Sequence, residues 1–157
     1  MISINEQVKE KLREGNVREA NLLLGFHYFL KGVVIKGNQM GRTIGFPTAN
    51  IKLSKETPLY LPNGVYAGYV EIEDYRYPGM INIGVRPTLD LHQLSIEVNI
   101  FDFNDDLYEK NISILFADRI RDELKFPGLY SLKEQIIKDK VRAEAMLGVG
   151  RKPNSGT

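Results

Sequence analysis

Cysteine is absent from this chain of 157 residues, and histidine is scarce, with only His27 and His92. Without cysteine, disulfide frameworks and thiolate-based metal or redox sites are excluded. The two histidines are too few for a histidine-rich zinc site, and neither lies at a metal-ligand spacing. Thiol redox chemistry and zinc binding are therefore not expected functions.

An excess of charge of one sign is also missing, since 21 basic and 20 acidic residues leave a net charge of +1. Nucleic-acid binders usually carry a basic excess or stripe, although a neutral protein can still hold a local cationic pocket for phosphate. No apolar run approaches the roughly 18–20 residues of a membrane span, and the N-terminus lacks the pattern of a secretory signal. We therefore expect a cytoplasmic protein with neither nucleic acid nor membrane as a partner.

The length is that of one domain with a single core. From residue 27 to about 118 the sequence is dense in Val, Ile, Tyr and Phe, with Gly, Pro, Asn and Asp between the runs. The candidate strands are 28–36, 46–52, 65–73, 79–85, 94–101 and 111–117. Six short strands without intervening helices predict a mainly β fold, an antiparallel sheet closed as a barrel.

Helices are expected on both sides of this strand region. Residues 3–24 fit two short helices, with capping boxes that begin at Ser3 and Asn16. A further helix is predicted from Ser131, which would form its capping box with Glu134. Its apolar face would consist of Leu132, Ile136, Ile137 and Val141. The tail 148–157 is polar and rich in helix breakers, so we expect it to be disordered.

The segment Gly41-Arg-Thr-Ile-Gly-Phe-Pro-Thr-Ala-Asn50 carries the most information. Thr48 and Asn50 are two positions apart and would share one face of a strand, about 6.6–6.8 Å apart. Two neutral oxygen-bearing side chains suit a magnesium–polyphosphate complex, because Mg²⁺ takes few protein oxygens and completes its shell with water and phosphate. Pro47 keeps the approach to them extended. An ordinary turn leading into a strand would have a similar composition, so both interpretations stay open here.

The residues 36–43, Lys-Gly-Asn-Gln-Met-Gly-Arg-Thr, combine glycines with two cations, a composition that suits a loop over a triphosphate. Lys36 would contribute a point charge there, and Arg42 could donate two parallel hydrogen bonds to a phosphate. Glycines can take positive φ and let backbone N–H groups approach oxygens closely. The glycines in question are Gly37, Gly41 and Gly45. The pattern is not the GxxxxGK[ST] phosphate loop, and a plain hairpin turn is the alternative.

Glu97 is the leading candidate for a catalytic carboxylate. The residues Leu94, Ile96, Val98 and Ile100 alternate with Ser95, Glu97, Asn99 and Phe101. In a strand this alternation places the aliphatic side chains on the core and Glu97 on the opposite face. A solvated glutamate on an outward strand face is the alternative.

Several segments in order resemble riboflavin kinases, over about residues 28–145. The matching segments are Gly45-Phe-Pro-Thr-Ala-Asn50, Pro62-Asn-Gly-Val-Tyr-Ala67, Met80-Ile-Asn-Ile-Gly-Val-Arg-Pro-Thr88, Ser95-Ile-Glu-Val-Asn-Ile-Phe-Asp-Phe103, Asp106-Leu-Tyr108, Ile120-Arg-Asp-Glu-Leu-Lys-Phe126 and Gln135-Ile-Ile-Lys-Asp139. The resemblance implies a six-stranded Greek-key barrel. It also implies that Glu97 accepts the proton of the ribityl 5′-hydroxyl, and that Thr48 and Asn50 bind Mg²⁺ together with ATP.

Two further features follow from the same resemblance. Many family members carry His where this chain has Asn99, which can form hydrogen bonds but cannot titrate, so we assign it no proton transfer. Arg121 is our candidate for a cation on the flavin side, with a surface arginine as the alternative. Phe126 would stack on the isoalloxazine or belong to the core.

A second resemblance concerns the N-terminal part. The stretches Leu12-Arg-Glu-Gly-Asn-Val17 and Ala20-Asn-Leu-Leu-Leu-Gly25 are similar to the joint that precedes the kinase module in bifunctional bacterial FAD synthetases. We therefore expect three parts: a helical linker remnant at 1–26, a riboflavin kinase barrel with its C-terminal helix at 27–147, and the tail. An adenylyltransferase domain in a longer parent protein is an expected partner, and this chain is not expected to make FAD.

These observations predict an ATP-dependent riboflavin kinase that converts riboflavin and MgATP to FMN and ADP. A flavin-binding module without catalysis, acting as carrier, sensor or partner domain, is the alternative. Retention of Glu97, Thr48 and Asn50 together favours catalysis, because binding flavin alone needs no such set. An unrelated small barrel that binds nucleic acid is disfavoured by the neutral charge.

Overall fold

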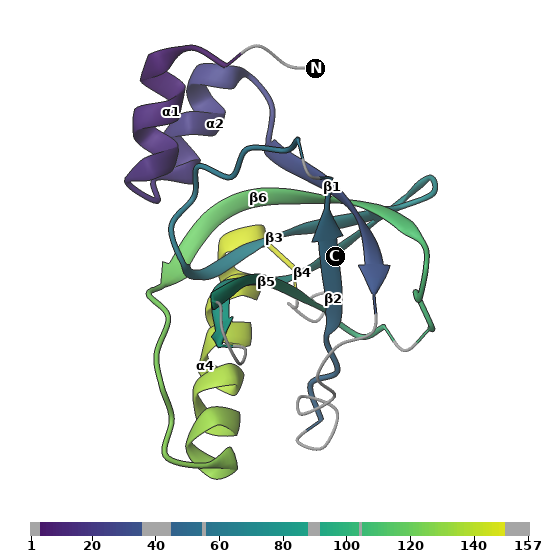
Figure 1. Cartoon of the computed structure of the whole chain (residues 1–157). Coiled ribbons are helices and arrows are strands. Elements are labelled where there is room, and N and C mark those ends of the chain that lie inside the picture. The colour runs from purple at the N-terminus through teal and green to yellow at the C-terminus, as the bar shows by residue number, and fades with distance from the viewer. Residues whose placement is uncertain (1–3, 36–44, 55, 88–91, 104, 150–157) are drawn as a thin grey trace, which may run out of the picture.

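A computed structural model describes residues 4–35, 45–54, 56–87, 92–103 and 105–149. Its centre is a closed barrel of six antiparallel strands (Figure 1). The strands are β1 (Tyr28–Ile35), β2 (Ala49–Leu53), β3 (Gly64–Ile72), β4 (Tyr75–Pro87), β5 (His92–Ile100) and β6 (Asn111–Arg121). The predicted mainly β fold with six strands is confirmed.

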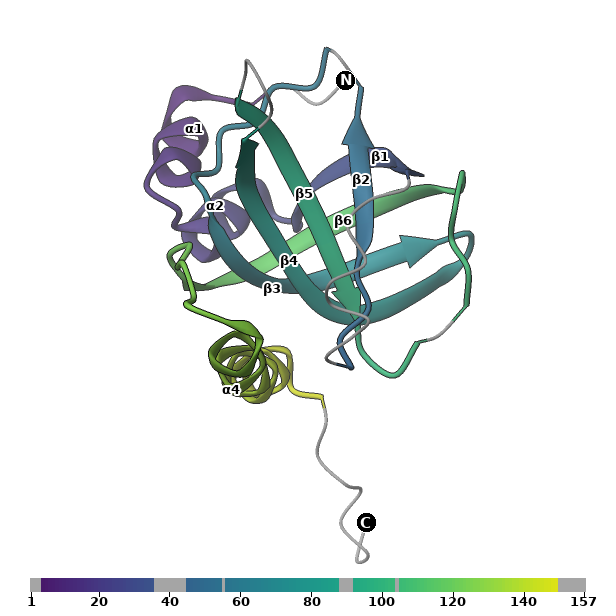
Figure 2. The same cartoon turned by 60° about the horizontal axis from the view of Figure 1, so that its bottom comes forward.

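The strand order around the barrel is β1-β2-β5-β4-β3-β6, and β6 pairs again with β1. Strands β3, β4 and β5 are neighbours in sequence and in space, whereas β5 returns to lie beside β2, which is a Greek-key arrangement. As a result β5 lies between β2 and β4 and pairs with both (Figure 2).

Alternate strand residues point inward and form an inner cluster. Its members include Leu30, Val34, Ile51, Tyr66, Val70, Ile81, Ile83, Ile96, Val98, Ile114 and Phe116. Tyr66 is fully buried, its ring meets that of Phe116 edge to face at 5.4 Å, and its hydroxyl donates to the carbonyl of Pro62 at 2.6 Å. Burial raises the pKa of the Tyr66 hydroxyl above its ordinary value.

Two short helices, α1 (Glu6–Arg13) and α2 (Val17–Leu24), pack against one side of the barrel (Figure 1). Their buried residues Val8, Leu12, Val17 and Ala20 extend the inner cluster. The amide of Asn21 on α2 joins the barrel directly: its Nδ2 donates to the carbonyl of Phe116 at 2.8 Å, and its Oδ1 accepts from the N–H of Tyr28 at 2.6 Å. The helical pair is thus packed and hydrogen-bonded onto β1 and β6.

The N-caps of these helices test two predictions. The side chain of Asn16 accepts from the N–H of Glu19 at 3.3 Å, which confirms it as the cap of α2. The prediction of Ser3 as the cap of α1 is wrong, because Asn5 occupies that position and accepts from the N–H of Val8 at 2.9 Å. Asparagine is as good a cap as serine, so the helix begins two residues later.

The long helix α4 (Leu129–Leu147) lies across another part of the barrel's outer surface (Figure 2). It covers an outer cluster formed by Val65, Ala67, Met80, Phe101, Ile120 and Ala143. It begins before Ser131, with Gly128 as the N-cap and no side-chain capping bond, so the predicted capping box is wrong. Its end is capped by Gly148 in the left-handed conformation, and most of the predicted tail lies outside the described residues.

The predicted apolar face of α4 is only partly correct. Ile136 packs against the outer cluster, but Ile137 is 45% exposed and Val141 is 64% exposed. The buried residues of the helix are instead Asp139 and Ala143. With Ile136 they follow the i, i+3, i+7 spacing of one helix face, so the inward face contains a carboxylate that the sequence pattern would place in solvent.

Among the helices of the described segments, none combines the length and the apolar character that crossing a bilayer requires.

Gly68 on β3 tests how closely the barrel is packed. A Cβ at this position would overlap the carbonyl oxygen of Leu115 on β6, next to a register shift between these strands. We expect Gly68→Ala to lower the free energy of unfolding by about 1–3 kcal/mol, as overpacking does. Asn111→Ala is the control, because Asn111 is exposed at the start of β6. Urea unfolding of both variants measures the effect, and equal stability of the two would contradict it.

Candidate functional site

A row of polar side chains crosses three neighbouring strands. Glu97 on β5 pairs in register with Asn50 on β2 and with Asn82 on β4. Directly opposed residues of antiparallel strands lie on the same face, with Cβ atoms about 4.5–5.5 Å apart. Because Ile96 and Val98 are buried in the inner cluster, this face is the outer one. The predicted orientation of Glu97, away from the core, is confirmed.

The outer face next to this row opens into a cleft of about 220 Å³ between the barrel and α4. Its polar lining residues are Thr48, Asn82, Glu97, Asn99, Arg121, Glu123 and Asp139. Its apolar lining residues are Phe46, Val65, Met80, Leu124, Phe126, Leu132 and Ile136. Convergent polar groups beside an apolar wall are typical of a site for an amphipathic small molecule.

A larger depression of about 730 Å³ lies elsewhere on the barrel, around Lys31, Lys52 and Asn111. Two carboxylates that line it form ion pairs with surface cations, Glu71 with Arg76 at 3.5 Å and Glu73 with Lys110 at 3.4 Å. It holds none of the predicted site residues. The cleft next to Glu97 is therefore the candidate site.

The segment before β2 brings Thr48, one of the two predicted metal ligands, to this cleft. Gly45 has a φ of +85°, which favours glycine, and the side chain of Asn99 braces the segment by donating to the carbonyl of Pro47 at 2.8 Å. Thr48 then lines the cleft, and Asn50 is buried beside Glu97. The assignment of no proton transfer to Asn99 stays a prediction.

The donors available for a cation are mostly neutral. Within the described segments, no group of three or more His, Cys, Asp or Glu side chains could hold a metal ion. The oxygens of Thr48 and Asn50 fit a magnesium ion only if further oxygens come from a ligand such as a polyphosphate. The predicted phosphate contacts Lys36, Gly37, Gly41 and Arg42 lie outside the described residues, so the phosphate loop stays a prediction.

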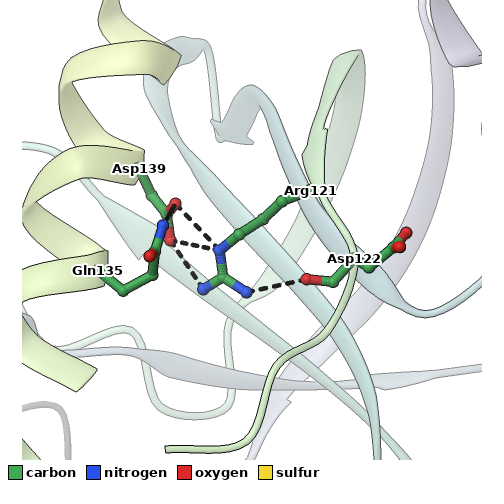
Figure 3. A network of polar contacts seen from close by, with 4 residues as sticks. All are labelled: Arg121, Asp122, Gln135 and Asp139. Carbon is green, nitrogen blue, oxygen red and sulfur yellow. Dashed lines mark hydrogen bonds and ion pairs between the residues drawn. The ribbon is translucent and has the colours of Figure 1, made fainter. Parts of the chain in front are cut away.

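Arg121, at the end of β6, also lines the cleft, and Figure 3 shows its contacts with Asp139 and Asp122. Its Nε donates to both carboxylate oxygens of Asp139 at 3.0 Å, and its Nη2 lies 2.8 Å from Oδ2. Its Nη1 donates to the carbonyl of Asp122 at 2.9 Å, and its guanidinium carbon lies 5.7 Å from the ring centroid of Phe126. With a side chain only 16% exposed, Arg121 is a fixed part of the cleft and not a surface arginine.

Sequence reasoning missed three of the polar lining residues. Asn82 has the same alternation as Glu97, in Met80-Ile-Asn-Ile83, and could have been found by it. Asp139 follows Ile136 by three positions, the spacing of an apolar helix face, and this is its only signal. Glu123 lies against β4, where a Cβ at Gly84 would come within 2.5 Å of its Oε1. Nothing local in the sequence predicts that contact.

Comparisons with known proteins identify the family. The family model for riboflavin kinase (flavokinase) matches residues 24–147. A bifunctional riboflavin kinase/FMN adenylyltransferase of Bacillus subtilis is 48% identical over 139 residues, which are 87% of this chain and 44% of that protein. Its Escherichia coli K12 counterpart is 38% identical over 144 residues, 90% of this chain and 45% of that protein. The chain thus spans less than half the length of these curated relatives.

Two solved structures share the fold. A crystal structure titled as a macrolide-efflux protein from Streptococcus pneumoniae superposes with a TM-score of 0.83 at 38% identity, over 90% of this chain and 47% of that one. Riboflavin kinase from Trypanosoma brucei superposes with a TM-score of 0.56 at 29% identity, over 76% and 79% of the two chains. The family match includes the barrel, the polar row and α4, and the chain belongs to the riboflavin kinase family.

Proposed function

We propose that this chain transfers the γ-phosphate of ATP to the ribityl 5′-hydroxyl of riboflavin, giving FMN and ADP. The observation that carries the proposal is the position of Glu97, in register between Asn50 and Asn82 and at the wall of an amphipathic cleft. Family membership supports the same reaction. We assign this activity to residues 27–147, with α1 and α2 packed on the barrel.

Glu97 is proposed as the general base. Its carboxylate accepts the proton of the 5′-hydroxyl while that oxygen forms a bond to the γ-phosphorus. The bond between the γ-phosphorus and the oxygen bridging it to the β-phosphate breaks, and that oxygen leaves with ADP. A positioned base contributes about 10²–10⁴-fold to the rate, and the rest of the barrier is lowered by positioning and charge stabilisation.

The nucleotide side would be organised by the segment before β2. The Thr48 hydroxyl and the Asn50 carboxamide are proposed to hold a magnesium ion, which neutralises charge on the phosphates when bound. The hydrogen bond from Asn99 to the Pro47 carbonyl keeps this segment at β5, next to Glu97. Lys36, Gly37, Gly41, Arg42 and Gly45 are proposed to contact the phosphates.

The flavin side would be formed by the wall that Arg121 and Phe126 share. Phe126 offers an apolar aromatic surface, and Arg121 offers N–H donors to a polar edge of the acceptor. Met80 and Leu132 add apolar surface to the same cleft. A non-catalytic flavin-binding module would use this wall as well, but it would have no need for the proton acceptor and metal ligands on the other side.

Glu97→Gln separates catalysis from binding. It keeps the shape and a hydrogen-bond acceptor but removes the proton acceptor, so turnover is expected to fall by about 10²-fold or more. Riboflavin binding should remain close to wild type. Glu71→Gln, another strand carboxylate on the barrel exterior, is the control. Steady-state formation of FMN, followed by chromatography, measures the effect, and turnover within a few-fold of wild type would remove Glu97 from the chemistry.

Thr48→Ala and Asn50→Ala test the metal ligands. Each removes one neutral oxygen, so we expect weaker use of MgATP with flavin binding in the absence of metal largely unchanged. Asn111→Ala is the control, since Asn111 is exposed at the start of β6. Calorimetric titration with MgATP, together with kinetics at varied magnesium, gives the answer. Unchanged MgATP affinity and unchanged kcat in both variants would show that the assignment is wrong.

The products define the extent of the activity. Adenylyl transfer attacks the α-phosphate and needs a second nucleotide site, and the relatives named for both activities are more than twice as long as the matched region. We therefore expect the 157-residue chain to accumulate FMN and no FAD with excess ATP. The Bacillus subtilis relative is the positive control. FAD formed in proportion to the amount of this chain would contradict the expectation.

A further inference from the structure

Asp139 is an unusual residue for the inward face of a helix that packs on a barrel. It is only 3% exposed, and it shares that face with Ile136 and Ala143, which belong to or contact the outer cluster. A carboxylate loses its hydration when it is buried and is tolerated there only when paired and hydrogen-bonded. Its position therefore requires specific partners.

Those partners occupy both of its oxygens. The guanidinium of Arg121 faces the carboxylate with its Nε and Nη2 atoms, which lie 2.8–3.0 Å from the oxygens of Asp139 (Figure 3). Gln135, one turn earlier on α4, donates from Nε2 to Oδ1 at 2.9 Å. Bidentate contact fixes the plane of a guanidinium as well as its place. The arrangement ties the end of β6 to the middle of α4.

Attachment of the helix does not by itself explain the pair. Buried ion pairs are often no more stabilising than apolar side chains of similar volume, and the surrounding outer cluster is apolar. Attachment of α4 to β6 is therefore not a sufficient reason for an ion pair at this place. The ion pair adds something that an apolar pair lacks, which is a guanidinium of fixed orientation at the wall of the cleft.

The donors of Arg121 show what that orientation offers. A guanidinium has five N–H groups. The N–H on Nε donates to both oxygens of Asp139, Nη2 forms an ion pair with Oδ2, and one N–H on Nη1 donates to the carbonyl of Asp122. At least one N–H on each terminal nitrogen then has no hydrogen-bond partner among the residues that the structure describes. Two adjacent donors thus remain on a side chain that lines the same cleft as Glu97.

We propose that Asp139, supported by Gln135, is a positioning residue that acts through Arg121. Asp139 holds the Nε side of the guanidinium, so that the two remaining N–H donors point to the acceptor substrate. The guanidinium lies over the ring of Phe126. The proposal rests on the proposed function, because it takes the acceptor to be riboflavin. It adds α4 to the parts of the chain that determine how the acceptor is oriented.

The experiment compares three variants. Two are the single substitutions Asp139→Asn and Arg121→Lys. The third, called the apolar pair, is a double variant that combines Arg121→Met and Asp139→Leu. Glu134→Gln, which changes an exposed carboxylate on the same helix, is the matched control. For each we would measure thermal unfolding, riboflavin binding without ATP by quenching of flavin fluorescence, and steady-state kinetics for both substrates. Arg121→Lys keeps the positive charge facing Asp139 but lacks the planar guanidinium with its fixed N–H donors. It therefore tests the orientation of the donors even if the double variant does not fold.

We expect Asp139→Asn and Arg121→Lys to bind riboflavin about 10-fold or more weakly, the usual scale for a hydrogen bond from a charged group. Their kcat/KM for riboflavin should fall by about 10²-fold, as small misplacements do, with the KM for ATP unchanged. The apolar pair should unfold at the wild-type temperature, but its riboflavin binding and turnover should stay below those of the wild type. Recovery of both by the apolar pair, or wild-type binding in the folded Asp139→Asn and Arg121→Lys variants, would overturn the proposal.

The two proposals can fail separately in this design. A wild-type chain that binds riboflavin without phosphorylating it would refute the kinase function, and the binding data would still decide on Asp139. A wild-type chain that makes FMN, with binding insensitive to Asp139→Asn and Arg121→Lys, would refute the positioning role alone. A wild-type chain that does not bind riboflavin would overturn both.

Discussion

The pairing of β5 with β2 on one side and with β4 on the other is the constraint on which the site depends. It aligns Asn50, Glu97 and Asn82 in one row although they come from three separated parts of the chain. Hydrogen-bonded ladders on both sides of β5 fix this alignment, because a shift by one residue would turn each side chain to the opposite face. The chemistry proposed for Glu97 relies on that fixed register.

The second part of the site is attached in a different way. Helix α4 is not a member of the sheet, and it meets the barrel through the outer cluster and the Arg121–Asp139 ion pair. The cleft therefore has one wall made of strands and another that depends on side-chain contacts. The proposed base lies on β5 within the sheet, whereas the proposed acceptor contact Arg121, at the end of β6, is held by Asp139 of α4, so the base and the acceptor contact are positioned by different interactions.

Much of the barrel could be predicted from the sequence, because alternation along a strand is a local property. The same alternation gave the orientation of Glu97 and would have given Asn82. The face of α4 was less predictable, since Ile137 and Val141 are apolar yet exposed, and Asp139 is charged yet buried. That outcome depends on Arg121, and the contact between them joins positions 18 residues apart that no periodic pattern relates.

The side chain of Asn21 has a consequence for how the molecule unfolds. The pair Tyr28 and Phe116 ends the β1–β6 ladder, and the Asn21 amide bonds to the N–H of one and the carbonyl of the other. The side-chain amide of Asn21 therefore takes the place of a backbone peptide group, and it extends the hydrogen bonding of β1 and β6 to helix α2. We therefore expect the helices and the barrel to open as one cooperative unit, with amide hydrogen exchange at Tyr28 following global opening of the barrel and not fraying at its edge.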